Sequence, residues 1–409
     1  MSKSMQTGSF QWMKSLNKSI ILNIIRLHGP ISRAEIAKLT ELTPPTVTNI
    51  ANELLEENWI LESERGESSG GRKPILLRLN AEAFHVVGVY AGAKKIRAVA
   101  ATVDGSIMAE QEVLVGKGPT EAEYLRMLKE LIRQVMQDSK AEQSSFLGIG
   151  VGMHGLVDPI QGISIFAPNI PLRNVKIKEV LETKFSLPVE VDNDVRALAL
   201  GESWFGQGQG LSHFVCVNVG TGIGAGIILD GRLYQGASFT AGEIGHTTID
   251  LHGPQCSCGN TGCLEALASG PSMEARVERA IASGEQSILH KPGSGADPVK
   301  VTGEEIFRAA VAGDQLAIRV MEETGTYLGV GIANLINSFN PSCIILSGGV
   351  FRANDYVLDS LRRTVQERAL QTPTNALQIV TSELGKNAMA IGAFTLLLAK
   401  IFTPEGVSK

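Results

Sequence analysis

The chain has 409 residues, which exceeds the ~100–200 residues of an ordinary domain and predicts two or three units. Its hydrophobic content of 44% and charged content of 19% are typical of a globular protein and exclude wholesale disorder. The 44 glycines follow no triplet period, which excludes collagen. Apolar runs stay below the ~18–20 residues that cross a bilayer, no signal-peptide core precedes Trp12, and five cysteines are too few for a disulfide scaffold. We therefore expect a soluble, cytoplasmic protein with no membrane segment.

Charge is distributed unevenly along the chain. The net charge is −5, but residues 1–80 carry ten Lys and Arg against eight Glu, which gives them +2 and leaves −7 for the remainder. Within the first forty residues, Glu35 is the one acidic side chain. A small basic segment on an acidic body is typical of a polyanion-binding module joined to a second function. An ordinary solvated surface can give the same balance, so charge alone does not identify the partner.

The N-terminal segment has the pattern of a helix-turn-helix. Apolar residues at helical spacing predict a helix over Leu16–Leu27 that ends at a Gly-Pro pair. Ser32 and Glu35 have the spacing of a capping box for a second helix. Thr43 caps a third helix, over 44–57, which opens with proline. The second and third helices are separated by three residues and form the helix-turn-helix.

A basic hairpin follows these helices. Two apolar strands, Trp59–Ser63 and Ile75–Leu79, are joined by the Gly-rich turn 66–73. This order predicts a winged helix whose last helix enters the major groove of double-stranded DNA. A helix-turn-helix that serves only for packing is the alternative, and the basic wing favours DNA binding. The side chains expected to contact bases or phosphates are Ser32, Arg33, Thr43, Thr46, Thr48, Asn49, Asn52, Arg72 and Lys73.

The rest of the chain contains an internal repeat. An apolar strand that enters a glycine turn, followed by a returning strand, occurs over Val86–Val103 and again over Phe214–Leu229. The copies lie so far apart that the repeat is a whole subdomain and not a solenoid unit. Helical stretches such as 121–138 and 175–185 alternate with strands such as 146–151. The pattern predicts two α/β subdomains with a ligand cleft.

The densest group of metal-binding residue types is His246, Cys256, Cys258 and Cys263. Three thiolates and one imidazole form a tetrahedral set that suits a structural zinc ion with no open position. The Gly-rich turn 259–262 lets the loop fold back toward the first two cysteines. The alternative is three reduced thiols in an ordinary loop. Polar, Gly-rich loops seldom bury three free cysteines, so the pattern favours zinc.

A second group of polar residues indicates a sugar site. Asn193 and Asp194 follow the strand 188–191, and open α/β sheets bind ligands at the ends of such strands. The pair offers the donors and acceptors that vicinal hydroxyls need, although Asp194 could merely cap its own helix. Gly-rich turns at 220–226 and 347–349 could hold phosphate, or could be ordinary tight turns. The residues expected to join the pair are Glu243, His246, Glu265 and Asn169.

These motifs together resemble the ROK family of sugar kinases and sugar-responsive repressors. Gly242–His246, nine further residues, Cys256–Gly259 and Gly262–Glu265 closely resemble the zinc-loop signature of that family. Asn193–Ala197 resembles its sugar-binding segment, and Gly70–Pro74 with the helix-turn-helix resembles the arm of the NagC/XylR-type repressors. The resemblance covers nearly the whole chain.

The resemblance implies an α/β fold with an N-terminal winged helix-turn-helix. A duplicated actin-like, ribonuclease-H-like sugar-binding body with two subdomains and a cleft would follow. The domains expected from it are the winged helix over 1–80, subdomain 1 over 81–196 completed by a C-terminal helix over 388–405, and subdomain 2 over 197–387 with the zinc loop.

The resemblance also implies roles for individual residues. It assigns zinc to His246, Cys256, Cys258 and Cys263, and sugar hydroxyls to Asn169, Asn193, Asp194, Glu243, His246 and Glu265. In the kinases of the family Asp194 would be the general base. Those kinases carry Asp-x-Gly-Gly-Thr where this chain has Tyr90–Lys94, and Tyr90 cannot hold Mg²⁺ as a carboxylate does. Loss of that group costs phosphoryl transfer several orders of magnitude, so we predict that the protein is not an enzyme.

The sequence therefore predicts a sugar-responsive transcriptional regulator, a repressor of carbohydrate transport or catabolism genes. Its expected partners are a DNA operator, a sugar or sugar phosphate in the cleft, and a second copy of itself in a dimer or tetramer, with structural zinc as cofactor. One alternative is an ATP-dependent sugar kinase with a fused DNA-binding arm, which Asp194 and the 220–226 turn support. Another is a repressor that senses a protein partner. Ligand-induced release and ligand-promoted binding of DNA are both compatible with the sequence.

Overall fold

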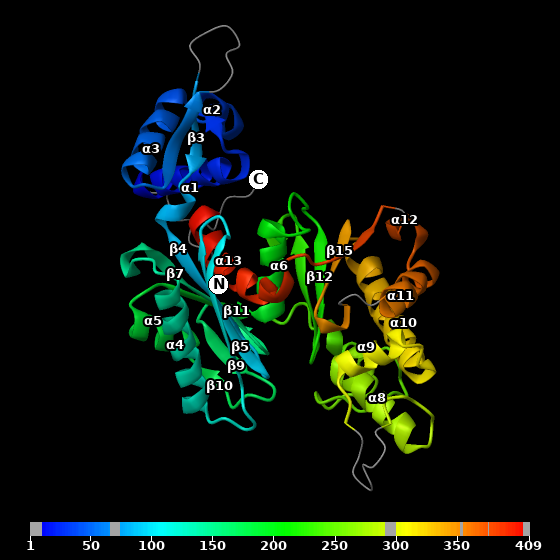
Figure 1. The fold of residues 1–409 in the computed structure, drawn as a ribbon. Coiled ribbons are helices and arrows are strands. Elements are labelled where there is room, and N and C mark those ends of the chain that lie inside the picture. Colours follow the sequence, from blue (N-terminus) through cyan, green and yellow to red (C-terminus); the bar gives the residue numbers. More distant parts are fainter. Residues whose placement is uncertain (1–9, 66–73, 291–299, 352–354, 375, 404–409) are drawn as a thin grey trace. The chain divides into compact units, whose positions relative to one another are not determined.

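The computed structural model describes residues 10–65, 74–290, 300–351, 355–374 and 376–403. The chain forms two compact units, each described here by itself (Figure 1). Unit 1 comprises Met1–Asp194 and Ala393–Lys409, and unit 2 comprises Val195–Gly392. Two helices, α6 (Asp194–Phe205) and α13 (Ala388–Phe402), therefore have residues in both units.

Unit 1 begins with three helices and a small antiparallel sheet. The elements are α1 (Phe10–His28), β1 (Ile31–Ser32), α2 (Arg33–Thr40), α3 (Pro44–Glu56), β2 (Ile60–Arg65) and β3 (Ile75–Leu79). The strand order is β1-β3-β2, so the hairpin pairs with a short strand between the first two helices. This is a winged helix, as the sequence predicts. The sequence missed β1, because two residues carry no periodicity, and it began α1 at Leu16 where the helix begins at Phe10.

Side-chain caps fix where α2 and α3 begin. The Ser32 hydroxyl accepts the N–H of Glu35, and the Glu35 carboxylate accepts the N–H of Ser32 at 3.0 Å, so the predicted capping box is present. The Thr43 hydroxyl accepts the N–H of Thr46 in the same way. Glu41 follows α2 in the left-handed conformation, with φ at 57°, and turns the chain toward α3.

An aromatic cluster joins the winged helix to the rest of unit 1. Trp59 stacks on Phe84 with ring centroids 4.2 Å apart, and it meets the edge of Phe402 at 6.2 Å. The Arg26 guanidinium lies 5.9 Å from the centre of the Phe402 ring, and burial lowers its pKa to about 10. Phe402, the last residue of α13, thus packs against Arg26 of α1 and against Trp59, which immediately precedes β2.

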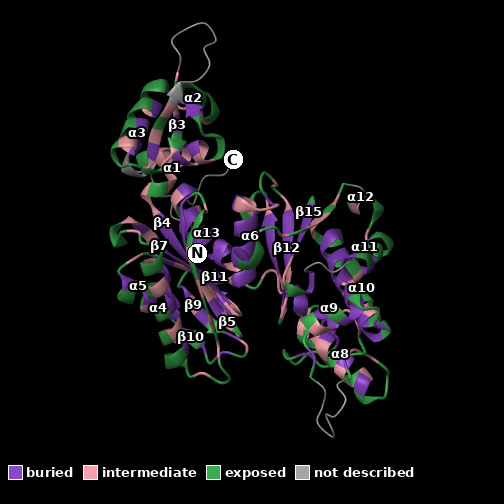
Figure 2. Ribbon diagram, viewed as in Figure 1, coloured by how far each residue is buried: buried purple, intermediate pink, exposed green. Residues whose placement is uncertain are grey.

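A five-stranded sheet forms the centre of unit 1, in the order β11-β7-β4-β5-β6. Its strands are β4 (His85–Ala91), β5 (Lys95–Thr102), β6 (Ile107–Leu114), β7 (Phe146–Met153) and β11 (Val189–Asn193). Strand β4 is buried along almost its whole length (Figure 2). One face of the sheet packs against α4 (Glu121–Asp138) and α5 (Ile177–Phe185), whose apolar residues join those of β4 and β7 in one core. A smaller sheet has the order β10-β9-β8, formed by β8 (Leu156–Asp158), β9 (Ile163–Phe166) and β10 (Arg173–Val175).

The C-terminal part of α13 lies directly on this sheet. A Cβ added at Gly150 would lie 1.8 Å from the Ala393 carbonyl oxygen, so only glycine permits the approach. The segment Gly385–Phe402 is long and apolar enough to cross a membrane by composition, with a mean hydropathy of 1.2, but 67% of it is buried. Its apolar character is explained by packing inside the protein.

Unit 2 contains a sheet with the order β14-β13-β12-β15-β16. Its strands are β12 (Phe214–Val219), β13 (Ile223–Leu229), β14 (Arg232–Leu233), β15 (Cys343–Ser347) and β16 (Gln378–Thr381). Its remaining helices are α7 (Leu264–Ala268), α8 (Gly270–Ala282), α9 (Gly303–Val311), α10 (Gln315–Phe339), α11 (Asp355–Arg368) and α12 (Gln371–Thr374).

The two sheets have one topology. In each, the first three strands form an antiparallel meander and the next two continue the sheet in parallel from the first strand. This agreement confirms the predicted duplication and the actin-like body.

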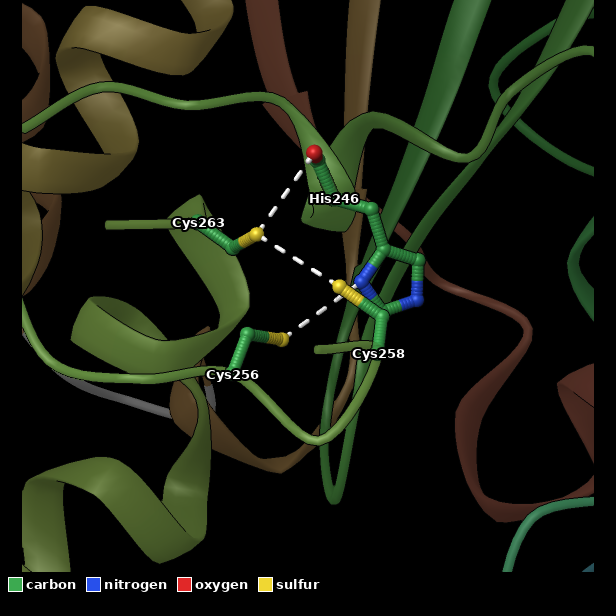
Figure 3. A group of neighbouring side chains, drawn as sticks. All are labelled: His246, Cys256, Cys258 and Cys263. Atoms are coloured by element: carbon green, nitrogen blue, oxygen red, sulfur yellow. Dashed lines mark hydrogen bonds between the residues drawn. The ribbon is translucent and has the colours of Figure 1, made fainter. Parts of the chain in front are cut away.

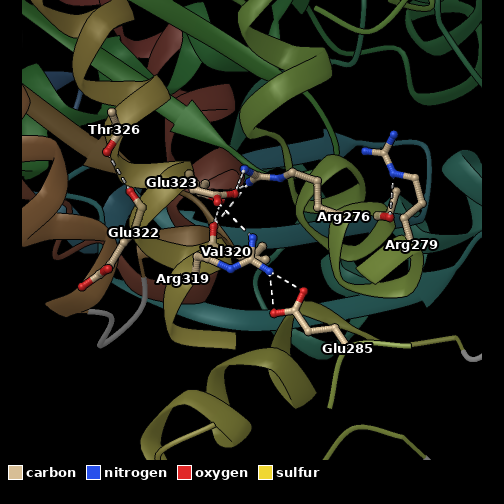
Figure 4. A network of polar contacts seen from close by, with 10 residues as sticks. Arg276, Arg279, Glu285, Arg319, Val320, Glu322, Glu323 and Thr326 are labelled. Atoms are coloured by element: carbon tan, nitrogen blue, oxygen red, sulfur yellow. Dashed lines mark hydrogen bonds and ion pairs between the residues drawn. The ribbon is translucent and has the colours of Figure 1, made fainter. Parts of the chain in front are cut away.

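A network of arginines and carboxylates ties α8 to α10 on the surface of unit 2 (Figure 4). Arg276 lies 3.2 Å from a Glu323 carboxylate oxygen and above the Tyr327 ring. Arg319 binds both Glu285 oxygens at 2.7 Å. The exposed Arg319–Glu285 pair contributes ~0–1 kcal/mol, whereas the Arg276 side chain is largely buried.

Candidate functional site

The predicted recognition helix, α3, presents polar side chains to solvent. Thr48, Asn49 and Asn52 are exposed, and Thr46 is partly buried. Thr48 donates its hydroxyl to the Pro44 carbonyl at 2.9 Å, which fixes its rotamer. Asn49 and Asn52 lie one turn apart at exposed positions of one helix, the arrangement that base readout in a major groove requires.

The other residues predicted to contact DNA differ in exposure and in their side-chain partners. Thr43 is exposed at the start of α3, whereas Ser32 is buried as the cap of α2. Arg33 lies 3.1 Å from Glu62 and 3.5 Å from the Asn52 side chain, so it ties α2 to α3 and the wing. Arg72 and Lys73 lie outside the described residues.

The predicted metal ligands converge in unit 2. One ligand atom from each of His246, Cys256, Cys258 and Cys263 lies within 4.8 Å of the others (Figure 3). The Cys258 and Cys263 sulfurs are 3.8 Å apart, and the Cys256 sulfur is 3.6 Å from His246 Nδ1. Tetrahedral zinc with metal–ligand distances of ~2.3 Å to sulfur and ~2.0–2.1 Å to nitrogen implies separations of about 3.8 and 3.6 Å. The four residues therefore fit a metal ion.

The backbone builds this cluster by a tight reversal. Cys256 donates its N–H to the Asn260 carbonyl at 2.8 Å, and Gly259 and Gly262 have φ values of 92° and 70°. A Cβ on Gly262 would lie 1.5 Å from the Asp250 carbonyl oxygen, so the loop requires glycine there.

Electrostatics differ among the thiols of the cluster. Hydrogen bonding from the Asn260 backbone lowers the pKa of Cys258, whereas burial raises the pKa of Cys263 to about 12. A metal ion is the charge that would deprotonate the buried thiol.

In unit 1, polar residues meet at the carboxyl ends of β7 and β11. The Asn193 amide donates to the Gly155 carbonyl at 3.0 Å, and Gly155 packs against the 166–168 segment that precedes Asn169. Asp194 is buried at the first position of α6, and its Oδ2 lies 3.9 Å from His154 Nδ1. The sequence analysis missed His154, although it follows a strand of the same sheet and the rule that found Asp194 could have found it.

In unit 2, the predicted residues lie around the start of β13. Glu243 precedes the short helix η3 (Ile244–His246), and His246 is its last residue; η3 contacts α7 and β13. Glu265 lies in the first turn of α7, and its Oε2 accepts the N–H of Ile223 at 2.9 Å. A Cβ at Gly222 would lie 2.7 Å from that oxygen, so the carboxylate occupies the glycine turn that the sequence offered to phosphate.

A winged helix joined to a duplicated α/β body, with a loop whose His and Cys side chains could hold a metal ion, is the architecture of a DNA-binding regulator with a ligand-binding body. The chain belongs to the ROK family, whose model matches residues 86–400. A MarR family model matches residues 15–67, which cover the helix-turn-helix and β2.

Relatives and solved structures agree with this assignment. A putative xylose repressor of Caldicellulosiruptor sp. is 34% identical and covers 96% of this chain and 98% of its own length. The dual regulator NagC of Escherichia coli is also 34% identical, over 96% of this chain and 94% of its own. A ROK transcriptional regulator described as a homolog of E. coli MLC superposes with a TM-score of 0.83 at 32% identity, over 95% and 97% of the two chains. The predicted family, fold class and regulator class are confirmed.

Kinases of the family match the body alone. A ROK glucokinase from Streptomyces griseus, solved with glucose and AMPPNP, has a TM-score of 0.68 and 31% identity. It covers 76% of this chain, whereas the chain accounts for 98% of the kinase. The chain is thus a body of kinase fold with a DNA-binding segment added.

Proposed function

We propose that this protein is a cytoplasmic repressor whose affinity for an operator changes when a sugar binds its ROK body. One observation carries the proposal: a single chain combines a helix-turn-helix whose last helix has exposed polar side chains with a body whose loop brings four possible metal ligands together beside the candidate sugar ligands. The relatives named for xylose and for N-acetylglucosamine are equally identical to it, so identity does not select the sugar.

The DNA-binding proposal rests on α3 and the wing. Asn49 and Asn52 would contact base edges, and Thr43, Thr46 and Thr48 would contact bases or phosphates. Winged helices of this kind read two half-sites as symmetric dimers, and we therefore propose a homodimer or a tetramer built from dimers. Arg33 would have to exchange Glu62 for a phosphate on binding.

The candidate sugar ligands form two groups, each within one unit. Asn169, Asn193 and Asp194 are the candidates in unit 1. In unit 2, Glu243 and Glu265 are joined by His246, whose Nδ1 faces the sulfurs while its Nε2 points away from them (Figure 3). An imidazole that gives one nitrogen to a metal keeps the other for a hydroxyl.

The metal that we propose is zinc, held by His246, Cys256, Cys258 and Cys263. Four protein ligands leave no open position, so the ion would be structural. It would fix the His246 ring and bring Glu265, two residues after Cys263, to the start of β13.

Two features oppose the kinase alternative. Strand β4 carries Tyr90, two residues before Gly92 of the turn, where the kinases have a carboxylate, and the turn before β13 is occupied by the Glu265 carboxylate. A carboxylate bound to a backbone N–H of the turn repels the phosphate that would use it. Phosphoryl transfer depends on metal and phosphate positioning, so we expect turnover far below the ~1 per second of slow kinases.

Helix α13 is the proposed link between the body and the DNA. It begins in unit 2 and ends in unit 1, where Phe402 packs against Trp59 and Arg26. In a Phe402→Leu variant we expect the sugar to bind as before while its effect on DNA affinity shrinks.

The test is a gel-shift titration with a sugar panel. The duplex is first selected by the protein from a random library, and each sugar is then added to the complex. We expect one sugar to change the operator affinity by ~5- to 150-fold, the usual range of allosteric coupling. An unchanged affinity with every sugar, or turnover with ATP near 1 per second, would overturn the proposal.

A further inference from the structure

The turn at the carboxyl end of β4 is filled by a side chain of the strand itself. A Cβ added at Gly92 would lie 2.5 Å from both Cζ and the hydroxyl oxygen of Tyr90, so the phenol ring lies over Gly92. The buried Tyr124 donates its hydroxyl to the Gly92 carbonyl at 3.1 Å. Two phenol rings therefore pack against this turn, and the Gly92 N–H is already used by the Lys95 carbonyl at 3.1 Å.

Asp194 lies close to both rings. In the parallel part of the sheet, Tyr90 of β4 pairs with Gly152 of β7, which in turn pairs with Asp192 of β11. Asp192 lies two residues before Asp194. Burial and the charge of Asp194 both raise the pKa of Tyr90, and burial with the charges of Tyr90 and Asp194 does the same for Tyr124. The carboxylate thus faces two neutral phenols.

The charged groups described at this edge are Asp194, His154 and the cations of the turn and of β5. His154 Nδ1 lies 3.9 Å from Asp194 Oδ2. Lys94, in the turn, is exposed to solvent, and Lys95 and Arg97, on the strand that leaves the turn, both pair with Glu112. A phosphate monoester carries about −1.5 to −2 charges near neutral pH and is normally held by free N–H groups and cations. Here it would meet a carboxylate, a phenol ring and an N–H that is already bonded.

We propose that Tyr90 is a specificity-determining residue that restricts the effector to an unphosphorylated sugar. The inference rests on the proposed function, because it takes Asp194 as the acceptor for a sugar hydroxyl. A neutral hydroxyl can donate to Asp194 without entering the space of the ring. An ester at the same hydroxyl would place its phosphorus and three oxygens beyond that point, where the Tyr90 ring packs on Gly92 and beside a buried negative charge.

The test compares each sugar with its own phosphate ester by calorimetry on the full-length, zinc-loaded protein. The pairs are xylose with xylose 1-phosphate, which keeps the pyranose ring, glucose with glucose 6-phosphate, and N-acetylglucosamine with its 6-phosphate. We expect the sugar that binds best to bind at least ~100-fold more tightly than its ester. Tyr90→Phe keeps the ring and is expected to keep that ratio, whereas Tyr90→Ala opens the space and is expected to reduce it to below ~10-fold.

The outcomes distinguish a failure of the proposed role of Tyr90 from a failure of the proposed function. An ester that binds the wild-type protein as tightly as its free sugar, or a ratio that Tyr90→Ala leaves unchanged while the variant stays folded, overturns the role of Tyr90 and leaves the proposed function standing. If no member of any pair binds, the proposed function fails and the inference falls with it.

Discussion

The two copies of the repeated subdomain close the same turn in different ways. In unit 1, the turn after β4 is covered by Tyr90, a residue of the strand that enters it. In unit 2, the turn between β12 and β13 is held by Glu265, a residue of α7, which follows the loop with the candidate metal ligands. One turn is filled by a neutral ring and the other by a carboxylate.

This difference shows how one fold can lose its phosphate-binding turns and still keep polar side chains that suit hydroxyl groups. Strand order and strand directions are the same in both copies, so the fold alone predicts two phosphate turns. The side chains make both turns unsuited to phosphate, because the Tyr90 ring fills the space at one turn and the Glu265 carboxylate places a negative charge at the other. The polar residues suited to hydroxyl groups are kept at the strand ends, which agrees with a sensor rather than a phosphotransferase.

The largest effect is expected from substitution of a proposed metal ligand in unit 2. In Cys263→Ser, the buried ligand is lost, and metal content measured by atomic emission should fall from about one ion per chain to a small fraction. A ligand at 1,000 times its Kd contributes about 4 kcal/mol, so the melting temperature should fall by roughly 10 °C. Cys343→Ala, which removes a buried thiol of β15 far from the loop in sequence, is the control and should keep its metal. Full metal content in Cys263→Ser would contradict the site.

Neutralising Asp194 in unit 1 and Glu265 in unit 2 compares the two carboxylates that we propose as sugar acceptors. Asp194→Asn removes charge-assisted bonds worth ~1.5–3 kcal/mol and should weaken sugar binding about 10- to 100-fold in calorimetry. Glu265→Gln keeps an oxygen that can accept the Ile223 N–H, so we expect a loss of about tenfold or less. If Glu265→Gln had the larger effect, the unit 2 carboxylate would be the main acceptor, and the assignment of Asp194 would be wrong.

A matched pair of glycine substitutions measures how firmly each turn is filled. The added methyl of Gly92→Ala meets a packed ring, and overpacking of this kind costs ~1–3 kcal/mol of unfolding free energy. In Gly222→Ala it meets the end of the flexible Glu265 side chain, so a smaller cost, about 1 kcal/mol, is expected. Urea denaturation of both variants gives the comparison. Equal costs would show that the Tyr90 ring is free to move away.

The smallest effect is expected outside both copies, at the cap of α2. Ser32→Ala should lower the unfolding free energy by ~1 kcal/mol. Hydrogen bonds from Ser32 hold the pKa of Glu35 below its ordinary 4.5. The stabilisation that Glu35 provides is therefore present above pH 4.5 and is lost as pH falls through the lowered value. The cost of Ser32→Ala should shrink in acid, and a cost independent of pH would contradict the capping role.

The fold was predictable wherever the sequence had periodicity or caps. The helix-turn-helix, the bounds of α4 and β3, and the repeated strand–turn–strand all follow from local pattern. Strand β1 was not predictable because it has two residues and depends on pairing with β3. The arrangement of α13, which lies on the sheet at Gly150, depends on contacts with residues more than two hundred positions away.

The candidate site was predictable in its ligands but not in its partners. The spacing of the three cysteines and His246 predicts that these four possible metal ligands come together, and the structure places their ligand atoms within 4.8 Å of one another. No local pattern reveals that Glu265 bonds to Ile223, that Arg33 pairs with Glu62, or that His154 faces Asp194. These contacts join residues brought together by the tertiary fold alone.

The most direct test is the affinity of the sugar for the protein with and without its selected operator. Calorimetry on the free protein and on the operator complex should give Kd values that differ by the same factor by which the sugar changes operator affinity, ~5- to 150-fold. That equality is what a sensor requires. Identical sugar Kd values in the two states would mean that occupancy of the body is never reported to the DNA.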